Sequence, residues 1–300
     1  WTLGPEALSN APLRAPKRRS ISFAATGFHA LRGRDPSNFS VLRCGAVRDR
    51  FGQIDMLHLD VWWRGLNVLV DGGTGLYNGE RAWLDHFLRT ASHNTVTVDD
   101  RDQMLHWRQF KFLYWTDAHL LAFEDHDGWS LAAGEHTGYA RHPGGCVHRR
   151  AVLFVKDALH VVIDRVSGSG RHRARLHWLA GDFPFDYAPD AATLSLATPE
   201  GTYSVATFDE SARPLPGDVA RGCESPPRGW LSRRYAHRAP TPSLAVIREG
   251  EAPLTTVTVM GEGPLDVALL AGVWNVRAGS RNVSFRIADG MFADVKESLG

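Results

Sequence analysis

The sequence predicts an all-β fold, a large antiparallel β-sandwich with few short helices. Most of the chain divides into short segments that are rich in β-branched and aromatic residues and end at glycine or polar turns. Only residues 80–92 have apolar side chains at helical spacing. Many short strands with frequent turns are typical of sandwiches, in which antiparallel sheets pack face to face. A hydrophobic content of 43% over 300 residues is enough to build such a core.

The expected strands follow one another from residue 41 almost to the C-terminus. In the first half they cover residues 41–47, 57–63, 67–71, 94–99, 150–155 and 159–166. In the second half they cover residues 255–261, 265–272, 273–277 and 282–287. Between these groups, residues 193–208 predict a hairpin that turns at Pro199-Glu200-Gly201, because Pro and Gly favour tight turns. Residues 80–92 predict one helix, which should be short.

The composition along the chain predicts three parts. Residues 1–22 are expected to be a linker, since the first 20 residues hold three prolines and a basic cluster. Residues 23–180 should form a β domain that carries the candidate site, and residues 181–300 a second β part that shares the same sandwich. Eleven of the fourteen histidines lie between His86 and His177, whereas the later residues are richer in turn-forming types.

Charge and hydropathy exclude some partners and leave others open. The 34 basic and 33 acidic side chains give a formal net charge of +1, which provides no argument for nucleic acid. A local basic groove for an acidic polymer is compatible with this balance. No apolar run is long enough for a transmembrane helix, and no signal peptide is recognisable. Because the chain begins at Trp1 rather than Met, we expect it to be part of a longer protein.

The three cysteines, Cys44, Cys146 and Cys223, are widely spaced and form no CxxC pair. This spacing excludes a zinc ribbon and a dense disulfide framework. One disulfide and three free thiols are both compatible with the sequence, so the cysteines do not indicate a compartment.

Residues 52–103 hold the side chains with the clearest potential chemistry. His58 and Asp60 lie two apart on an expected strand, so they should project from the same face. Asp71 ends the next strand, which should pair with the first as a hairpin, and His93 precedes a third strand. Two imidazoles and a carboxylate are a usual ligand set for Zn²⁺ and leave a fourth position for water or substrate. From spacing alone, histidines satisfied within a core are the more common case.

The order of these motifs resembles the signature of the heparinase II/III-like family. The matching residues are His58 with Asp60, the turn Asp71-Gly72-Gly73-Thr74 with Tyr77, and His93-Asn94-Thr95-Val96 followed by Asp99 and Gln103. Flanking similarities cover residues 27–32, 147–150 and 162–165. The resemblance extends over about residues 23–180, and the last 120 residues match only in their β character. Each piece alone is a weak signal, whereas the ordered combination is specific.

This resemblance implies a metal site and a reaction. In the family the metal ligands are the first histidine, the turn aspartate and the second histidine, which correspond to His58, Asp71 and His93. The implied ion is Zn²⁺ in a structural role beside the cleft. Asp60 and Asn94 are expected to lie behind these ligands and orient them. Because family lyases cleave uronic-acid-containing polysaccharides by β-elimination, the expected substrate is an acidic polysaccharide.

Candidate residues for catalysis and substrate binding follow from the same resemblance. Tyr77 corresponds to a cleft tyrosine and is expected to act as the acid, or as both acid and base. Arg89, His148 and Arg149 are expected to contact the substrate. The alternative is a surface salt bridge for Arg89 and a cross-strand structural role for His148 and Arg149. Met56 departs from the family pattern, because many members have a catalytic histidine there and a thioether transfers no proton.

A second departure concerns the rest of the enzyme. In the family an α/α toroid precedes the β part and supplies the other wall of the cleft, and no such helical region exists in this chain. We therefore expect an incomplete lyase that needs an N-terminal toroid domain of the same protein, located in the periplasm or cell envelope. One alternative, which Met56 favours, is a non-catalytic carbohydrate-binding or structural module of an envelope polysaccharide system. Another is a zinc hydrolase, although no HExxH-type motif supports it.

Overall fold

The computed structural model describes residues 19–46, 52–108 and 111–299, and antiparallel strands make up most of them. The predicted all-β fold is confirmed. Within these ranges the chain forms one short α-helix, α2 (Arg81–His86), and one 3-10 turn (Thr90–Ser92). Both lie inside the segment whose apolar spacing predicted a short helix.

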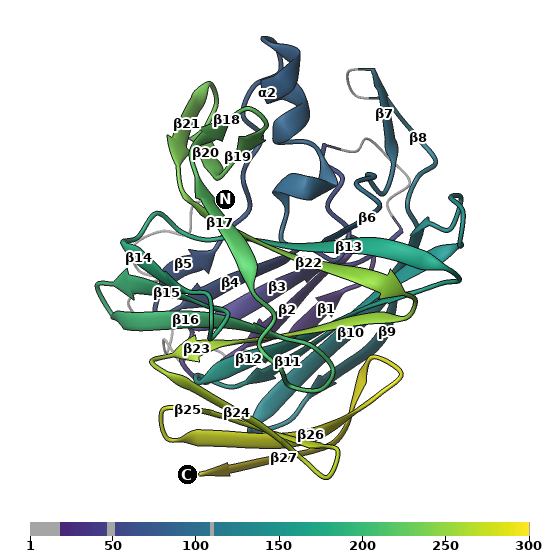
Figure 1. Cartoon of the computed structure of the whole chain (residues 1–300). Coiled ribbons are helices and arrows are strands. Elements are labelled where there is room, and N and C mark those ends of the chain that lie inside the picture. The colour runs from purple at the N-terminus through teal and green to yellow at the C-terminus, as the bar shows by residue number, and fades with distance from the viewer. Residues whose placement is uncertain (1–18, 47–51, 109–110, 300) are drawn as a thin grey trace, which may run out of the picture.

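An eight-stranded antiparallel sheet crosses the middle of the molecule in the order β14-β15-β16-β23-β12-β11-β10-β9 (Figure 1). Its strands are β9 (Ala118–Asp125), β10 (Trp129–Tyr139), β11 (Cys146–Val155), β12 (Leu159–Ser167), β14 (Phe185–Ala188), β15 (Thr193–Thr198), β16 (Gly201–Phe208) and β23 (Leu254–Glu262). The predicted hairpin is β15–β16, with Thr198 opposite Gly201 at the turn. This central sheet takes strands from both sides of residue 180.

Two smaller sheets lie against one face of the central sheet. The first is a meander of β1 (Ile21–Phe23), β2 (Phe28–Arg32), β3 (Phe39–Arg43), β4 (Leu59–Trp63) and β5 (Leu66–Leu69). The second has the order β17-β22-β13-β6 and consists of β17 (Gly217–Arg221), β22 (Pro242–Glu251), β13 (Arg171–Leu179) and β6 (Val96–Val98). The antiparallel pairing of β4 with β5 confirms the predicted hairpin.

The largest hydrophobic core joins the central sheet to these two sheets. Leu59 of the meander, Val152 of the central sheet and Trp178 of β13 are fully buried within it. Successive side chains of a strand point to opposite faces, so β13 turns Ala174 and Leu176 into this core. The residues between them on β13 therefore face away from this core.

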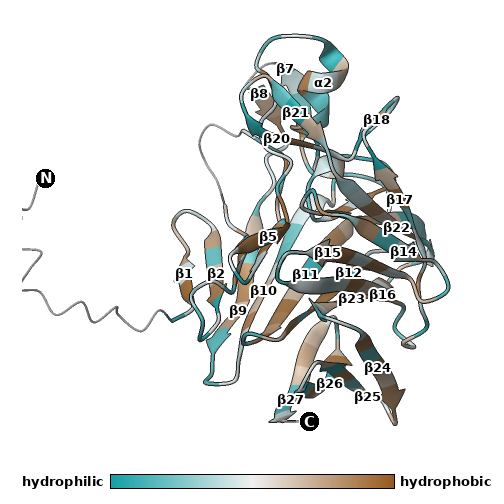
Figure 2. Ribbon diagram, turned by 90° about the vertical axis from the view of Figure 1, so that its left-hand side faces the viewer, coloured by the Kyte–Doolittle hydropathy of each residue, from teal (hydrophilic) through white to brown (hydrophobic). Residues whose placement is uncertain are grey.

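A C-terminal sheet covers the opposite face of the central sheet (Figure 2). It is formed by β24 (Leu265–Leu270), β25 (Val273–Ala278), β26 (Arg281–Ala288) and β27 (Met291–Leu299). Trp274 and Phe285 stack with ring centroids 6.0 Å apart, and both are buried with Leu153 and Val259 of the central sheet. The central sheet is thus buried on both faces.

Small elements project at the end of the molecule opposite the C-terminal sheet (Figure 1). Besides α2 they are β7 (Leu105–Arg108), β8 (Lys111–Leu113), β18 (Cys223–Glu224), β19 (Pro227–Arg228), β20 (Trp230–Arg234) and β21 (His237–Pro240). They pair as the short hairpins β7–β8, β18–β19 and β20–β21. The hollows of interest for function lie among these projections.

Three further expectations concern the whole chain. Residues 1–18 of the expected linker lie outside the described residues, whereas Ile21 and Ser22, which were assigned to it, belong to β1. All three cysteines are free thiols. Among the helices of the described ranges, none has the length and apolar character needed to span a membrane.

Candidate metal centre and adjoining groove

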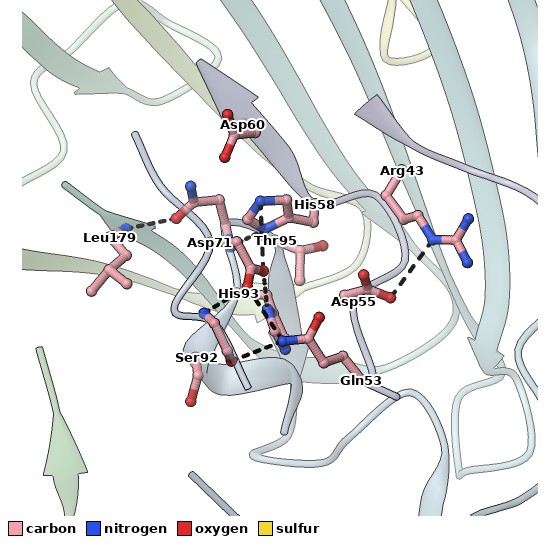
Figure 3. Close-up of polar contacts among 12 residues, drawn as sticks. Arg43, Gln53, Asp55, His58, Asp60, Asp71, Ser92, His93, Thr95 and Leu179 are labelled. Carbon is pink, nitrogen blue, oxygen red and sulfur yellow. Dashed lines mark hydrogen bonds and ion pairs between the residues drawn. The ribbon is translucent and has the colours of Figure 1, made fainter. Parts of the chain in front are cut away.

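Loops at the ends of strands bring the two histidines and the aspartate of the motif together (Figure 3). His58 directly precedes β4, Asp71 follows β5, and His93 follows the 3-10 turn. One possible ligand atom from each lies within 4.8 Å of the others. His58 was expected within the strand, but Leu57 has a φ of 61° and the His58 N–H donates to the carbonyl of Asp55 at 2.9 Å. This turn, rather than strand alternation, sets the direction of the His58 ring.

The distances within this cluster suit a small cation. His93 Nδ1 and Asp71 Oδ2 are 2.8 Å apart, and His58 Nε2 and Asp71 Oδ2 are 3.9 Å apart. Ligand atoms that lie about 2.1 Å from a tetrahedral zinc ion are about 3.4 Å from one another. The two distances to Asp71 Oδ2 therefore lie about 0.5–0.6 Å on either side of the separation expected around zinc.

Two buried ring nitrogens of the cluster, His58 Nε2 and His93 Nε2, have no hydrogen-bond partner in the described part of the chain. Buried polar atoms are nearly always bonded, so His58 Nε2, which faces Asp71 Oδ2, indicates a place for a ligand, whereas His93 contacts Asp71 through its other nitrogen, Nδ1. The Asn94 N–H donates to His58 Nδ1 at 2.9 Å, so a neutral His58 carries its proton on Nε2 in this arrangement. To bind a cation through Nε2, the ring would have to carry that proton on Nδ1 and give up the bond from Asn94. The residues present thus fit an ion held by His58, Asp71 and His93.

The electrostatics of the cluster favour a neutral His58, an ionised Asp71 and a protonated His93, so a bound cation would have to replace the proton of His93. Burial lowers the pKa of His58 to about 4, so this ring is neutral at pH 7. Burial opposes ionisation of Asp71, but the charge of His93 and its hydrogen bond outweigh burial and hold the pKa of Asp71 well below its usual range. Burial also lowers the pKa of His93, and the neighbouring Asp71 carboxylate more than reverses that shift.

Asn94 connects the backbone segments that carry the cluster. Its side chain spans three backbone segments, donating to the carbonyls of Leu59 (3.0 Å) and Val70 (3.1 Å) and accepting from the N–H of Leu179 (2.6 Å). These bonds tie the loop of His93 to the strand ends that carry the other two candidate ligands. An amide is suited to this place because it both donates and accepts.

Asp60 does not take the orienting role that was expected of it. Among the described contacts, no hydrogen bond joins Asp60 to either imidazole, and the bond that orients His58 comes from the backbone of Asn94. Burial raises the pKa of Asp60 to about 6, and the nearby charge of Asp71 contributes to this rise. The displacement of His58 out of the strand explains why the two residues do not act together.

A buried ion pair that the sequence analysis missed holds the same loops. Arg150 and Asp164 are 0% and 3% exposed and form a forked contact of 2.8 and 3.0 Å. Arg150 Nη1 also donates to the carbonyl of Leu57 at 2.6 Å and to that of Asn94. Both residues belong to the downstream strands of the family resemblance, but only the structure shows that their side chains meet beneath the cluster.

Met56, which replaces a family histidine, is fully buried in the main core. The Gln103 side chain accepts from the Met56 N–H and donates to its carbonyl, both at 2.9 Å. Thr95 Oγ1 donates to the same carbonyl at 2.9 Å. The backbone of residue 56 is therefore held rigidly while its side chain packs among apolar groups, where a thioether is well suited.

A groove of about 920 Å³ opens beside the cluster, between α2 and the β7–β8 hairpin. Gln53 and Tyr77 line it, together with Asp85 and His106. Gln53 connects the groove to the cluster, since its side-chain N–H donates to Asp71 Oδ1 at 3.3 Å and to a neighbouring backbone carbonyl at 2.9 Å. Tyr77 is 48% exposed, so its hydroxyl-bearing ring is open to a substrate in this groove.

The three expected substrate-binding residues lie in different surroundings. Arg89 is half exposed near the groove, and its Nε contacts Asp102 Oδ2 at 2.8 Å. His148 is fully buried and donates to Asp164 at 2.7 Å. Arg149 points to the opposite face of the central sheet, where it pairs with Glu135 at 2.8 Å. The expectation that His148 and Arg149 contact substrate is wrong, because alternation along β11 directs one into the core and the other toward the C-terminal sheet.

Comparison with known proteins agrees with this architecture. The family model for the heparinase II/III-like C-terminal domain matches residues 15–269. A curated heparin-sulfate lyase from Bacteroides stercoris is 25% identical over 169 residues, which are 54% of this chain and 23% of that protein. A solved heparinase III has a TM-score of 0.72 at 18% identity and covers 95% of this chain and 43% of its own.

A second solved structure, a mutant of the heparan sulfate lyase HepC from Pedobacter heparinus, has a TM-score of 0.72 at 17% identity over 96% of this chain and 43% of its own. The chain therefore spans less than half the length of these relatives. The family model covers most of the chain, and the fold is shared along nearly all of it. This chain belongs to the heparinase II/III-like family and corresponds to its C-terminal β domain.

Proposed function

We propose that this chain is the β domain of a bacterial polysaccharide lyase that cleaves a uronic-acid-containing polysaccharide by β-elimination. The observation that carries the proposal is the position of Tyr77 in a groove that adjoins the His58–Asp71–His93 cluster. Membership of a family with heparin and heparan sulfate lyases among its relatives supports an acidic polysaccharide as the substrate.

The cluster is proposed to hold Zn²⁺ in a structural role. Both imidazoles are buried, at 6% exposure for His58 and 0% for His93, so a bound ion would have little room for a substrate group. Bound there, the ion would hold together the strand ends that carry His58 and Asp71 and the loop that carries His93. These segments lie next to the wall of the groove. Gln53 would transmit this order to the groove, because it contacts both Asp71 and the groove interior.

β-Elimination requires three things of the side chains around the sugar. The C5 carboxylate must be neutralised, the C5 proton removed, and a proton supplied to the C4 oxygen as its bond to carbon breaks. A tyrosine can perform the last step as a general acid, and its phenolate can accept a proton as a base. Tyr77 is assigned to this proton transfer. The group that neutralises the carboxylate is assigned to the other wall of the cleft, because both N–H groups of the Gln53 amide already donate to Asp71 and to a backbone carbonyl.

The remaining groups are proposed to come from an N-terminal α/α toroid domain of the same protein. The chain supplies one wall of a groove, and its relatives are more than twice as long. The expected location of the full-length protein is the periplasm or cell envelope, where a polymeric substrate is accessible.

The test uses the full-length protein with sulfated and unsulfated uronate polymers. Ultraviolet absorbance of the unsaturated product reports lyase turnover directly. Tyr77→Phe is expected to lower kcat by at least about 100-fold, which is the usual contribution of a general acid. Tyr235→Phe is the matched control, because its ring lies 5.7 Å from that of Tyr77 and is similarly exposed without lining the groove.

Absence of unsaturated product from all polymers, with retained binding, would instead favour a non-catalytic carbohydrate-binding or structural module. The burial of Met56 is the observation that favours this second function, since no histidine from that position reaches the groove. Equal losses in the two tyrosine variants would remove Tyr77 from the reaction and leave only a packing role.

A further inference from the structure

A second hollow, of about 600 Å³, lies on the other side of α2 from the groove. Its floor is the outward face of the β17-β22-β13-β6 sheet, and its walls are α2 with the following turn and the β18–β19 hairpin. Arg173, Arg175 and His177 stand in line on this floor, because every second residue of β13 faces away from the core.

Strand register leaves Arg175 without a charged neighbour across the sheet. It stands opposite Ile247 of β22 on one side and Thr97 of β6 on the other. Directly opposed residues are the pairs that interact across strands, so no carboxylate meets Arg175 within the sheet. The one hydrogen bond that its side chain makes in the described chain runs from Nη1 to the carbonyl of Ala91 at 3.3 Å.

The acidic side chains that line the hollow are already engaged. Four aspartates contribute to its lining, and each has an arginine partner: Asp85 with Arg81, Asp100 with Arg173, Asp102 with Arg89, and Asp218 with Arg228. Arg228 is further fixed by donating to the side chain and carbonyl of Ser243 at 3.0 and 2.7 Å. Arg175 is therefore the one arginine of this lining that forms no ion pair with a described residue.

The neighbouring arginines make a buried, charged Arg175 energetically unfavourable when no anion is bound beside it. Burial, followed by the charges of Arg228 and Arg173, lowers the pKa of Arg175 to about 10, and the carboxylates of Asp100 and Asp218 offset only part of this shift. Like charges held together in a partly buried place are stable only at some free-energy cost, which an anionic ligand would relieve. Proteins generally concentrate such cost where a ligand binds.

We infer that Arg175 binds an anionic group, sulfate or carboxylate, of an acidic saccharide in this hollow. The guanidinium offers paired donors that match either group. Trp230 supplies an apolar wall for the sugar, and its indole N–H is already satisfied by the carbonyl of Cys223 at 2.7 Å. The choice of an acidic saccharide rests on the proposed function, whereas the anion site itself rests on the contacts of Arg175.

The test measures binding to the 300-residue chain by calorimetry at low salt. The probes are a heparin-derived tetrasaccharide, an unsulfated tetragalacturonate and inorganic sulfate. Arg175→Met keeps the aliphatic stem and removes the charge, and it should weaken one or both saccharides at least about tenfold, as expected for a charged hydrogen bond. Arg175→Lys should retain most of the affinity. Arg277→Met is the matched control, since Arg277 is an exposed arginine of the C-terminal sheet.

The relative affinities identify the group, since preference for the heparin fragment indicates sulfate and preference for tetragalacturonate indicates carboxylate. Arg175→Met should also unfold at the same temperature as the wild type or a higher one, because it removes an unpaired cation. The inference would be overturned if Arg175→Met lost less affinity than this, or if Arg277→Met lost as much. It would also be overturned if only inorganic sulfate bound, or if Arg175→Met unfolded at a lower temperature than the wild type. These readouts require no turnover, so failure of the lyase assay tests the proposed function separately.

Discussion

Two buried clusters of this molecule contain the same residue types, two histidines and one aspartate. In the first, His58 and His93 flank Asp71, and one nitrogen of each ring has no partner in the described chain. In the second, His136 and His148 lead to Asp164, and every ring nitrogen is bonded. Arg150 contacts Asp164 of the second cluster and the carbonyls of Leu57 and Asn94, which are the chain neighbours of His58 and His93 in the first.

The second cluster is a closed chain of hydrogen bonds. The Gly138 N–H donates to His136, His136 contacts His148 at 3.2 Å, and His148 donates to Asp164 at 2.7 Å. The guanidinium of Arg150 then neutralises Asp164. A cation is thus already present in this cluster as a side chain. Among the residues that the structure describes, no arginine contacts the carboxylate of the first cluster, and this difference, rather than residue composition, makes it the candidate metal centre.

The largest effect is expected from removing the built-in cation. Arg150→Met should lower the free energy of unfolding by about 3–5 kcal/mol, because it leaves Asp164 charged and buried. Urea denaturation measures this change. Arg150→Met combined with Asp164→Leu should recover most of the loss, and a single variant within about 1 kcal/mol of the wild type would contradict the closed-network interpretation.

Zinc should stabilise the folded protein, and only through the first cluster of His58, Asp71 and His93. At a free Zn²⁺ concentration of 100 times Kd, the chelator-treated chain should gain about 2.7 kcal/mol of unfolding free energy. His58→Ala should abolish this gain, whereas His148→Gln, although less stable, should keep it. An undiminished gain in His58→Ala would show that zinc binds elsewhere.

Acid should destabilise the closed network. Burial lowers the pKa of His136 and of His148, so the unfolded chain binds more protons than the folded one below the unfolded value of about 6.5. Stability should therefore fall as pH decreases below that value, by up to about 1.4 kcal/mol per pH unit for each ring. Denaturation between pH 7.5 and 5 measures the slope, and His136→Gln should reduce it by about one proton. An unchanged slope would show that His136 is protonated in the folded state.

The smallest effect on stability is expected at an exposed ion pair with the same contact distance as Arg150 and Asp164. Arg89 and Asp102 approach to 2.8 Å, as do Arg150 and Asp164, but the Arg89 side chain is 49% exposed. Arg89→Ala should change stability by less than about 1 kcal/mol, because water screens the pair. A loss comparable to that of Arg150→Met would mean that contact distance, not burial, decides the strength of these pairs.

The candidate site was predictable where order along the chain carried the signal. The histidines at 58 and 93 and the aspartate at 71 lie beside strands or a turn in a characteristic order, and they do converge. The expectation that Asp60 orients an imidazole was wrong because a single left-handed residue, Leu57, removes His58 from the strand alternation on which that expectation depended. The expectation that His148 and Arg149 contact substrate was wrong because the sequence does not show which face of a strand packs against a second sheet.

The sequence by itself determined the β character, the hairpins and the approximate positions of the turns, because these depend on neighbours a few residues apart. It also marked the three side chains of the candidate metal centre. Only the tertiary structure decided which histidines are closed off by an arginine and which face a shared carboxylate, and which arginine is left unpaired. Those outcomes depend on contacts between strands that are 50 to 100 residues apart, such as Arg150 with Asn94 and Arg175 with Thr97.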